Sequence, residues 1–358
     1  MGLRVAVVGV GPVGDRILRC LYERDFPLAD EPIVMATRAR KEILADREVD
    51  VKQAAPELFK GLDIVFFAGR EGAKGASRQW ADVAIEEGAY CIDNGSDFRL
   101  YPDVPLVVPE VNMDAVTPET KLIASPNCST IQTVVAIAPL HRAAGIKRMV
   151  AATYQSVSGW GAAAMDELDR QIKQLAAGEE VTFDPKVFTR PIALDCLPHI
   201  DRFLPNGYTK EELKMVNETR KILDAPEMQI TTTCVRVPVQ IGHAVAANLE
   251  FKAPLSADEA REILEKAPGV VVIDGPTDDP NAVEVRNAPE ELKYPTQRDV
   301  LRDEWKDLVL VGRIRDDETV DSGINMWIVA DNLRKGAATN VVQIAEAMIE
   351  RGFFEGKV

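Results

Sequence analysis

The sequence is poor in cysteine and histidine and contains no long apolar run. Its five cysteines are scattered without a CxxC pair, so neither a disulfide framework nor a zinc site is indicated. No segment approaches the roughly 20 consecutive apolar residues that cross a bilayer. Residues 5–13 are apolar but lead into Asp15 and Arg16 without a signal-peptide cleavage site, so we expect a cytoplasmic protein with no membrane partner.

Basic residues are also in deficit. The 358 residues include 57 acidic and 42 basic side chains, which gives a net charge of −15. A surface of that sign repels nucleic acid and anionic lipid, so we expect no nucleic-acid partner. If the ligands are anions, a few local arginines and lysines must bind them. With 46% apolar residues the chain is long enough for two domains, each with its own core.

The first third of the chain alternates short apolar strands with helical patterns. An apolar run at 3–8 is followed by three glycines, Gly9, Gly11 and Gly14, and then by residues with helical spacing. Further strands are expected at 33–36, 63–68, 90–92, 104–108 and 122–124, and a helix at 76–87. This order predicts an α/β fold with a doubly wound, mainly parallel sheet.

From about residue 130 the pattern changes to longer alternating strands. Helices are expected at 131–144, 162–177 and 210–223, and strands at 148–155, 229–239 and 243–251. Thr209 and Glu212 have the spacing of a capping box. The pattern predicts an α+β second domain with one sheet face free for a partner subunit. The Pro-, Asp- and Asn-rich residues 274–307 indicate a long surface excursion.

The glycine turn and the end of the second strand are candidates for binding a dinucleotide. A GxGxxG turn between a strand and a helix offers free N–H groups to a pyrophosphate. The basic residues after the second strand, with no carboxylate among them, favour the 2′-phosphate of NADP over NAD. The alternatives are a turn without ligand and a solvated basic loop. The predicted contacts are Gly9, Gly11, Pro12, Val13, Gly14, Thr37, Arg38 and Arg40.

Cys128 is a candidate nucleophile. It lies between a short strand and an apolar helix, and a helix N-terminus stabilises a thiolate. A cysteine used only for packing is the alternative. The other four, which we interpret as structural, are Cys20, Cys91, Cys196 and Cys234.

Of the three histidines, His243 is the best placed for proton transfer. If residues 236–243 form a hairpin, Arg236 and His243 face each other, and a cation that binds an anion then lies beside a proton carrier. A core histidine is the alternative, and His199 remains open. Lys214, Glu218 and Lys221 share one helix face, which a solvated ion-pair stripe also explains. Gln155 ends a strand before a glycine turn, where its amide could orient a carbonyl.

Five segments together resemble the aspartate-β-semialdehyde dehydrogenases. They are SPNCST at 125–130, TYQ at 153–155, VNET at 216–219, TCVRVP with GH within 233–243, and ADNLRKGAA at 330–338. The resemblance implies a Rossmann-type NADP domain over 1–129, completed by a C-terminal helix within 331–358. It also implies a domain for catalysis and dimerisation, with a mixed sheet, over 130–330, and a homodimer or a tetramer.

The resemblance also implies roles for single residues. Cys128 would form an acyl thioester, His243 would transfer protons and Gln155 would orient the substrate. The expected substrate contacts are Arg236 with the α-carboxylate, Glu218 with the α-ammonium group, and Asn127 close by. The expected phosphate contacts are Arg99 and Lys221. The expected contacts of the nicotinamide half are Ser158, Gly159 and Asn332.

The implied reaction is the NADP-dependent, phosphate-consuming oxidation of aspartate 4-semialdehyde to 4-aspartyl phosphate. The reverse direction would serve the biosynthesis of lysine and diaminopimelate, threonine and methionine. Two alternatives stay open from the sequence. One is another phosphorylating semialdehyde reductase of the same fold, and the other is a non-catalytic paralogue that binds a dinucleotide.

Overall fold

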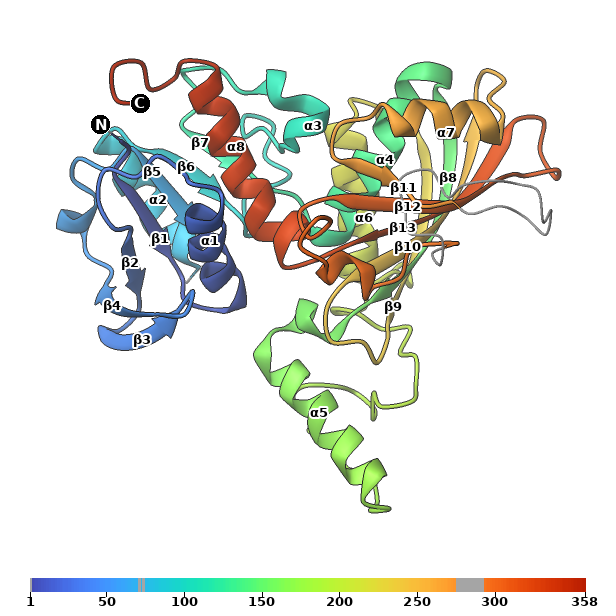
Figure 1. The fold of residues 1–358 in the computed structure, drawn as a ribbon, viewed down its shortest axis with the longest axis horizontal. Coiled ribbons are helices and arrows are strands. Elements are labelled where there is room, and N and C mark those ends of the chain that lie inside the picture. Colours follow the sequence, from blue (N-terminus) through green and yellow to red (C-terminus); the bar gives the residue numbers. More distant parts are fainter. Residues whose placement is uncertain (1, 70–71, 73–74, 275–292) are drawn as a thin grey trace. The chain divides into compact units, whose positions relative to one another are not determined.

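The strands of the described residues form two sheets, one in each of two compact units (Figure 1). The structure is a computed structural model that describes residues 2–69, 72, 75–274 and 293–358. The first unit comprises the chain up to Asn127 and from Ala337 onward, and the second comprises Cys128–Gly336. Within the described residues no helix combines the length and the apolar character needed to cross a bilayer.

The first unit contains a seven-stranded sheet in the order β3-β4-β2-β1-β5-β6-β7. The parallel strands are β1 (Val5–Val8), β2 (Ile33–Ala36), β5 (Ile64–Phe67), β6 (Tyr90–Asp93) and β7 (Leu122–Ala124). The hairpin of β3 (Arg40–Leu44) and β4 (Arg47–Gln53), in which β4 runs parallel to β2, was not expected from the sequence. The strand expected at 104–108 is wrong, because only Leu106 bridges to Ala124 there.

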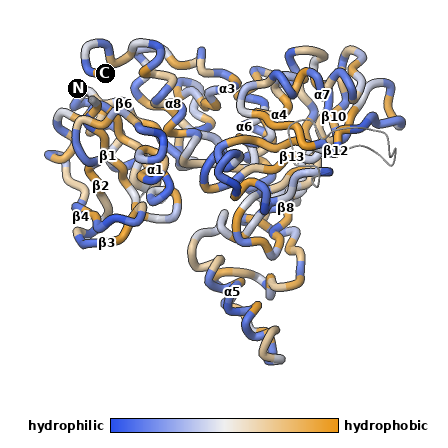
Figure 2. Tube along the Cα trace, viewed as in Figure 1, coloured by the Kyte–Doolittle hydropathy of each residue, from blue (hydrophilic) through white to orange (hydrophobic). Residues whose placement is uncertain are grey.

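Helices cover both faces of this sheet because its central strands are apolar on both sides. In β1, Val5 and Val7 pack under α1 (Pro12–Glu23) and α8 (Thr339–Glu350), whereas Ala6 and Val8 pack under α2 (Ala76–Glu86) and η1 (Pro56–Phe59). Figure 2 shows these strands as apolar segments inside the unit. The apolar residues Val341, Ile344 and Met348 of α8 are buried, as is Ala337 just before the helix. The short helices α3 (Pro109–Asn112) and η2 (Met113–Ala115) complete the unit.

The second unit contains a six-stranded mixed sheet in the order β11-β12-β13-β10-β8-β9. Its strands are β8 (Ile146–Gln155), β9 (Gln229–Arg236), β10 (His243–Phe251), β11 (Val270–Val272), β12 (Val309–Asp316) and β13 (Gly323–Ala330). The pairs β8–β9 and β11–β12 are parallel and the others antiparallel. One face is covered by α4 (Cys128–Ala144), α6 (Lys210–Ile222) and α7 (Ala257–Glu265). The predicted fold class is therefore confirmed.

The capping box predicted for α6 is present. Thr209 N–H donates to Glu212 Oε2 at 2.7 Å, and Thr209 Oγ1 accepts from Glu212 N–H at 3.3 Å. Both residues are buried, so the first turn of α6 is fixed in place against the sheet.

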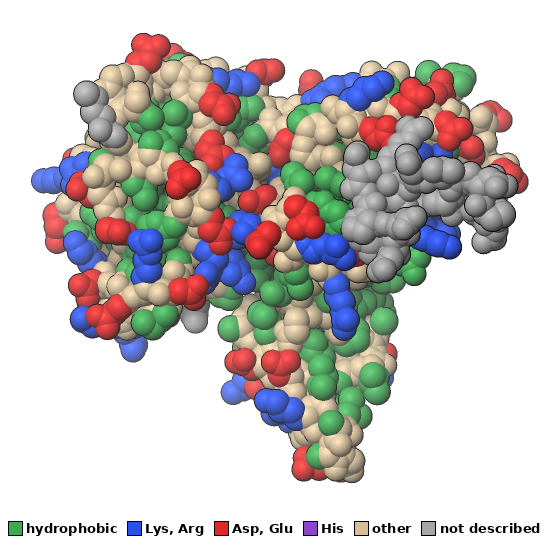
Figure 3. All heavy atoms as spheres, in the orientation of Figure 1, with side chains coloured by type: hydrophobic (Ala, Val, Ile, Leu, Met, Phe, Trp, Pro, Cys, Tyr) green, Lys and Arg blue, Asp and Glu red, His purple; other side chains and the backbone are tan. Residues whose placement is uncertain are grey.

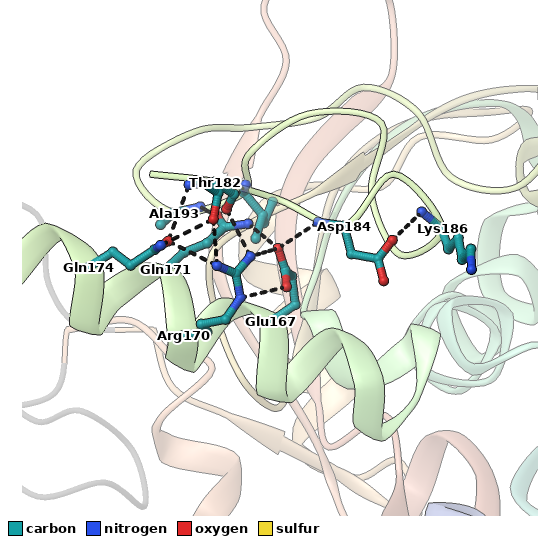
Figure 4. A network of polar contacts seen from close by, with 9 residues as sticks. Glu167, Arg170, Gln171, Gln174, Thr182, Asp184, Lys186 and Ala193 are labelled. Carbon is teal, nitrogen blue, oxygen red and sulfur yellow. Dashed lines mark hydrogen bonds and ion pairs between the residues drawn. The ribbon is translucent and has the colours of Figure 1, made fainter. Parts of the chain in front are cut away.

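A polar network joins α5 (Ala162–Ala176) to the loop that follows it (Figure 4). The Arg170 guanidinium makes a two-pronged contact with the Glu167 carboxylate, and Gln171 Oε1 accepts from the N–H groups of Ile192 and Ala193 at 2.9 Å each. Gln171 is fully buried, so these bonds replace water for the loop backbone. The network steadies α5, which leads directly from the short helix η3 (Val157–Trp160).

The surface excursion expected at 274–307 is only partly open to comparison, because residues 275–292 lie outside the described part. Within 293–307 the expectation is correct only in part, because most of these residues are exposed or half-buried but some are anchored in the interior. Val300 and Trp305 are buried in a core with Ala244, Leu310 and Val329. These apolar residues are too far apart in the sequence to form a periodic pattern, and only the fold brings them against the sheet.

Two glycines of the first turn should differ sharply in their effect on stability. A Cβ on Gly14 would lie 2.0 Å from the Gly9 carbonyl oxygen, whereas a Cβ on Gly11 would meet no atom within 4 Å. We expect Gly14→Ala to lower the free energy of unfolding by about 1–3 kcal/mol or more, and Gly11→Ala by less than about 1 kcal/mol. Thermal unfolding of both variants without ligands measures this. Equal midpoints would contradict the proposed packing.

Candidate active site

Three predicted site residues lie side by side on neighbouring strands of the second unit. Gln155 ends β8 and is paired in register with Arg236 of β9 on one side and His243 of β10 on the other. All three are buried on the face that the helices cover. The hairpin expected at 236–243 is wrong, because β8 lies between β9 and β10. The side chains of Arg236 and His243 nevertheless converge on Gly159, since a Cβ there would lie 3.0 Å from Arg236 Nη1 and from His243 Nε2.

Cys128 is the first residue of α4, three residues before the helix start expected from the sequence. It is partly exposed, whereas Cys20, Cys91 and Cys234 are buried and Cys196 is exposed. A Cβ on Gly336 would lie 3.0 Å from Cys128 Cβ, so the turn at 331–336 packs directly against the cysteine. Asp331 holds that turn by accepting N–H bonds from Leu333 and Arg334.

A hydrogen-bonded group of buried residues surrounds the His243 ring. Ser156 N–H donates to His243 Nδ1 at 3.1 Å, and Ser156 Oγ lies 3.0 Å from the same nitrogen. Ser156 Oγ donates to Asn332 Oδ1 at 3.0 Å, and the Gly242 N–H donates to the same oxygen at 2.9 Å. Ser158 Oγ also contacts the Asn332 amide. The predicted residues Ser158 and Asn332 therefore lie beside His243, and Ser156 was missed.

A second chain of polar contacts starts at Gln155. Its Nε2 donates to Ser129 Oγ at 2.8 Å and to Glu211 Oε1 at 3.2 Å. Lys214 Nζ lies 3.2 Å from Glu211 Oε2 and 3.4 Å from Asp201 Oδ2. Glu211 and Lys214 thus extend the row of Arg236, Gln155 and His243 on its helix side. Glu211 was not predicted, and Lys214 was noted only as part of a helix-face stripe.

Glu218 and Lys221 were predicted on α6 instead of Glu211 and Lys214. Each lies seven residues further along the same helix, roughly 10 Å away at 1.5 Å per residue. The register of α6 against β9 decides which turn faces Gln155, and only the fold shows it. The capping box was the feature of the sequence that could have indicated these two residues. It fixes the start of α6 and so places Glu211 and Lys214 in the first turns of that helix.

Burial dominates the electrostatics of this site. Desolvation lowers the pKa of Arg236, and the nearby Glu211 carboxylate opposes that shift. Desolvation, followed by the positive charge of Arg236, lowers the pKa of His243 to about 3, again with Glu211 opposing. Proton transfer by His243 would favour a pKa near neutrality. Burial beside Arg236 instead holds the pKa well below that range. The imidazole is neutral at physiological pH.

The residues predicted to bind phosphate or cofactor in the first unit lie at the carboxyl ends of its strands. Gly9 follows β1 with φ +123°, and Gly11 is the N-cap of α1 with open space before it. Thr37 and Arg38 are exposed after β2. Arg40 is bound to Glu42, with Nη2 to Oε2 at 2.7 Å, so part of the predicted positive charge is neutralised.

The other predicted residues of this unit, Arg99 and Asn127, are buried. Arg99 donates from Nη2 to the Asn94 carbonyl oxygen at 2.8 Å, and Asn127 directly precedes Cys128. On the surface that Figure 3 shows, acidic and basic side chains are intermixed. No group of acidic, histidine and cysteine side chains within the described residues could hold a metal ion.

The fold and the site define a nicotinamide-dependent semialdehyde dehydrogenase. Residues 4–118 match the NAD-binding domain of semialdehyde dehydrogenases, and residues 137–335 match their dimerisation domain. The chain is 45% identical to the aspartate-semialdehyde dehydrogenase of Aquifex aeolicus over 98% of its own length and 99% of the relative. It is 43% identical to aspartate-semialdehyde dehydrogenase 2 of Vibrio cholerae over 98% of each chain.

Solved structures agree with these relatives. The crystal structure of aspartate semialdehyde dehydrogenase II from Vibrio cholerae is 42% identical and superposes with a TM-score of 0.86, covering 99% of this chain and 100% of that one. A second crystal structure, with the same values, is that enzyme complexed with ASA. The chain belongs to the aspartate-semialdehyde dehydrogenase family and is an oxidoreductase.

A methyl group at Gly159 should obstruct the site without unfolding the protein. Its Cβ would crowd both Arg236 Nη1 and His243 Nε2 at 3.0 Å. We expect Gly159→Ala to lower kcat/KM for aspartate semialdehyde by a factor on the order of 10 to 10², because small displacements of reacting groups cost that much. Steady-state kinetics check the loss, and thermal unfolding checks the fold. Wild-type kinetics would show that no ligand enters between these two side chains.

Proposed function

We propose that this protein catalyses the NADP-dependent, phosphorylating oxidation of L-aspartate 4-semialdehyde to L-4-aspartyl phosphate. The reductive direction would then serve the biosynthesis of lysine and diaminopimelate, threonine and methionine. The observation that carries the proposal is the convergence of Arg236 and His243 on Gly159, beside Gln155 and in the unit whose first helix begins at Cys128. A buried guanidinium suits a carboxylate, and a thiolate at a helix start suits an aldehyde.

Each group has a defined task in this reaction. Cys128 adds to the aldehyde carbon and holds the acyl group as a thioester, which phosphate then cleaves. Arg236 binds the α-carboxylate as a charge-assisted fork. We assign the α-ammonium group to Glu211 in place of Glu218, since Glu211 contacts Gln155. Lys214 replaces Lys221 as a phosphate-binding candidate, because Lys214 lies beside Glu211.

The first unit fits a bound dinucleotide. Gly9 and Gly14 are needed for close backbone packing, whereas Gly11 leaves open space before the N-terminus of α1, where a pyrophosphate would accept N–H bonds from the turn Gly11–Gly14. When bound, the cofactor supplies the hydride acceptor of the oxidative reaction. Arg38 is our principal candidate for the 2′-phosphate of NADP, because Arg40 is engaged with Glu42. Ser158, Gly159 and Asn332 remain the proposed contacts of the nicotinamide half.

We also propose a homodimer formed through the sheet face opposite the helices. Ala152, Ala246 and Trp327 form one row across β8, β10 and β13 on that face, and Trp327 packs against the partly exposed Tyr154. Ala152, Ala246 and Trp327 border a hollow of about 600 Å³. Partly exposed apolar and aromatic side chains on one sheet face suit a partner subunit. A tetramer built from such dimers is the alternative that solution mass would distinguish.

Replacement of the proposed nucleophile tests the reaction. Cys128→Ser should lower kcat by several orders of magnitude, because an alcohol is far less ionised than a thiol at neutral pH. Phosphate-dependent reduction of NADP with aspartate semialdehyde measures it, and binding of NADP by fluorescence is the control for an intact cofactor domain. Cys196→Ser, at the exposed cysteine, is the matched variant and should keep wild-type activity.

Two outcomes would overturn this assignment. Near-normal turnover of Cys128→Ser would exclude Cys128 as the nucleophile. The wild-type protein could also oxidise glyceraldehyde 3-phosphate or N-acetylglutamate semialdehyde faster than aspartate semialdehyde. That result would show that aspartate semialdehyde is not its substrate.

The two arginines after β2 should contribute unequally to cofactor choice. Arg38→Ala should weaken NADP binding by roughly tenfold or more, because a hydrogen bond to an ionised group contributes about 1.5–3 kcal/mol. Arg40→Ala should have a smaller effect, because Glu42 already binds that side chain. The kcat/KM values for NADP and NAD at fixed ionic strength measure both effects. Equal use of the two cofactors by the wild type would contradict the proposed NADP preference.

A further inference from the structure

The turn formed by residues 331–336 begins beside His243. Strand β13 ends at Ala330, which is paired in register with His243. Asn332 follows, and its Oδ1 accepts a hydrogen bond from the Gly242 N–H at 2.9 Å. Because Gly242 directly precedes His243, the start of the turn is bound to the strand end that carries the histidine.

The same turn ends against Cys128. A Cβ on Gly336 would lie 3.0 Å from Cys128 Cβ and 3.4 Å from Cys128 Cα, so even a methyl group would crowd the cysteine. The turn is closed by the Gly336 N–H, which donates to the Asp331 carbonyl oxygen, five residues back, at 2.9 Å. One short segment therefore contacts both the surroundings of the histidine and the proposed nucleophile.

Arg334 anchors the middle of this turn to the sheet. Its Nε lies 2.8 Å from Asp307 Oδ1 and its Nη2 lies 3.1 Å from Asp307 Oδ2, which is a two-pronged ion pair. The two side chains are only 6% and 19% exposed. Such a fork fixes geometry as well as contributing energy. Since Asp307 lies two residues before β12, the pair connects the turn to the start of another strand.

The shape of the turn makes an anchor necessary. The bond between residues 336 and 331 is the wide kind that defines a π-helical turn, and η5 (Arg334–Ala338) is π-helical. Turns of this width are rare and occur frequently at functional sites. Contacts outside the turn must therefore stabilise it, and the ion pair of Arg334 is such a contact.

We propose that Arg334, through its ion pair with Asp307, is a positioning residue of the reaction. It fixes the turn 331–336 and thereby the position of Cys128 relative to His243. The inference rests on the proposed function, in which Cys128 is the nucleophile. Arg334 acts through the turn, whose two ends contact the groups that it positions.

Removal of the charge on Asp307 tests the pair in turnover. Asp307→Asn keeps the size of the side chain and loses the carboxylate. We expect kcat to fall by a factor on the order of 10 to 10², because small displacements of reacting groups cost that much. KM for aspartate semialdehyde should change by less than about a factor of three, since its proposed carboxylate and ammonium contacts lie on β9 and α6. An unchanged kcat would overturn the proposal.

A second arginine–aspartate pair in the same unit supplies the matched control. Arg261 Nε on α7 lies 2.6 Å from Asp274 Oδ2, and the Asp274 side chain is 8% exposed. Asp274 also accepts the Ile314 N–H at 3.2 Å, so this pair anchors α7 to β12. Asp274→Asn should lower the thermal midpoint and leave kcat unchanged. An equal loss of kcat in both variants would show that kcat only follows stability, which contradicts a positioning role for Arg334.

Gly336→Ala tests the contact with the cysteine directly, also if Asp307→Asn does not fold. Its Cβ would crowd Cys128 at 3.0 Å. We expect kcat to fall by a factor on the order of 10 to 10², and iodoacetamide to label Cys128 several-fold more slowly. Wild-type values of both quantities would show that the turn does not control the cysteine.

Cysteine labelling follows the position of Cys128 without any turnover. Mass spectrometry compares its rate of alkylation with that of the exposed Cys196 in the same molecule. In Asp307→Asn we expect Cys128 to be labelled several-fold faster relative to Cys196, because the loosened turn uncovers it. The buried Cys91 and Cys234, one in each unit, should stay unlabelled, which checks that the fold is intact.

The labelling separates this inference from the proposed function. An unchanged ratio of the two rates in Asp307→Asn would overturn the role of Arg334, whatever the substrate is. A changed ratio, together with a wild-type protein that does not oxidise aspartate semialdehyde, would refute the proposed function alone and support the control of Cys128 by the turn.

Discussion

The register of β8 against its two neighbours is the constraint on which the candidate site depends. Because Gln155 is paired with Arg236 on one side and with His243 on the other, a cation, an amide and an imidazole stand in one row on one face of the sheet. Side chains alternate between faces along a strand, so a slip by one residue would move Gln155 to the opposite face. The same face receives α4, which begins at Cys128, and the first turns of α6, which bring Glu211.

Burial gives these groups properties that they lack in water. Arg236, Glu211 and His243 are almost entirely removed from solvent, so each charge acts strongly on the others and the imidazole stays neutral. An acidic protein with a net charge of −15 can bind anions in such a place, because a guanidinium in a low-dielectric site outweighs distant surface charges.

In the first unit the same short turn serves both folding and binding. Gly9 and Gly14 allow two backbone segments to approach, and Gly11 leaves space where a ligand could lie. These requirements are separate although they occur in one motif. The unexpected hairpin after β2 shows a related effect, because it brings Glu42 to Arg40 and leaves Arg38 as the more available cation.

The sequence by itself determined the fold class, the parallel strands β1, β2 and β5 of the first unit, the start of α6 and the family, because apolar periodicity, capping residues and motifs are local properties. It also singled out Cys128, Gln155, Arg236 and His243. It could not determine strand order, so the expected hairpin was wrong, nor which turn of α6 faces Gln155, so Glu211 was missed. Ser156 was missed because only the folded chain brings it to His243. Those depend on pairing between segments far apart in the chain, and only the tertiary structure decides them.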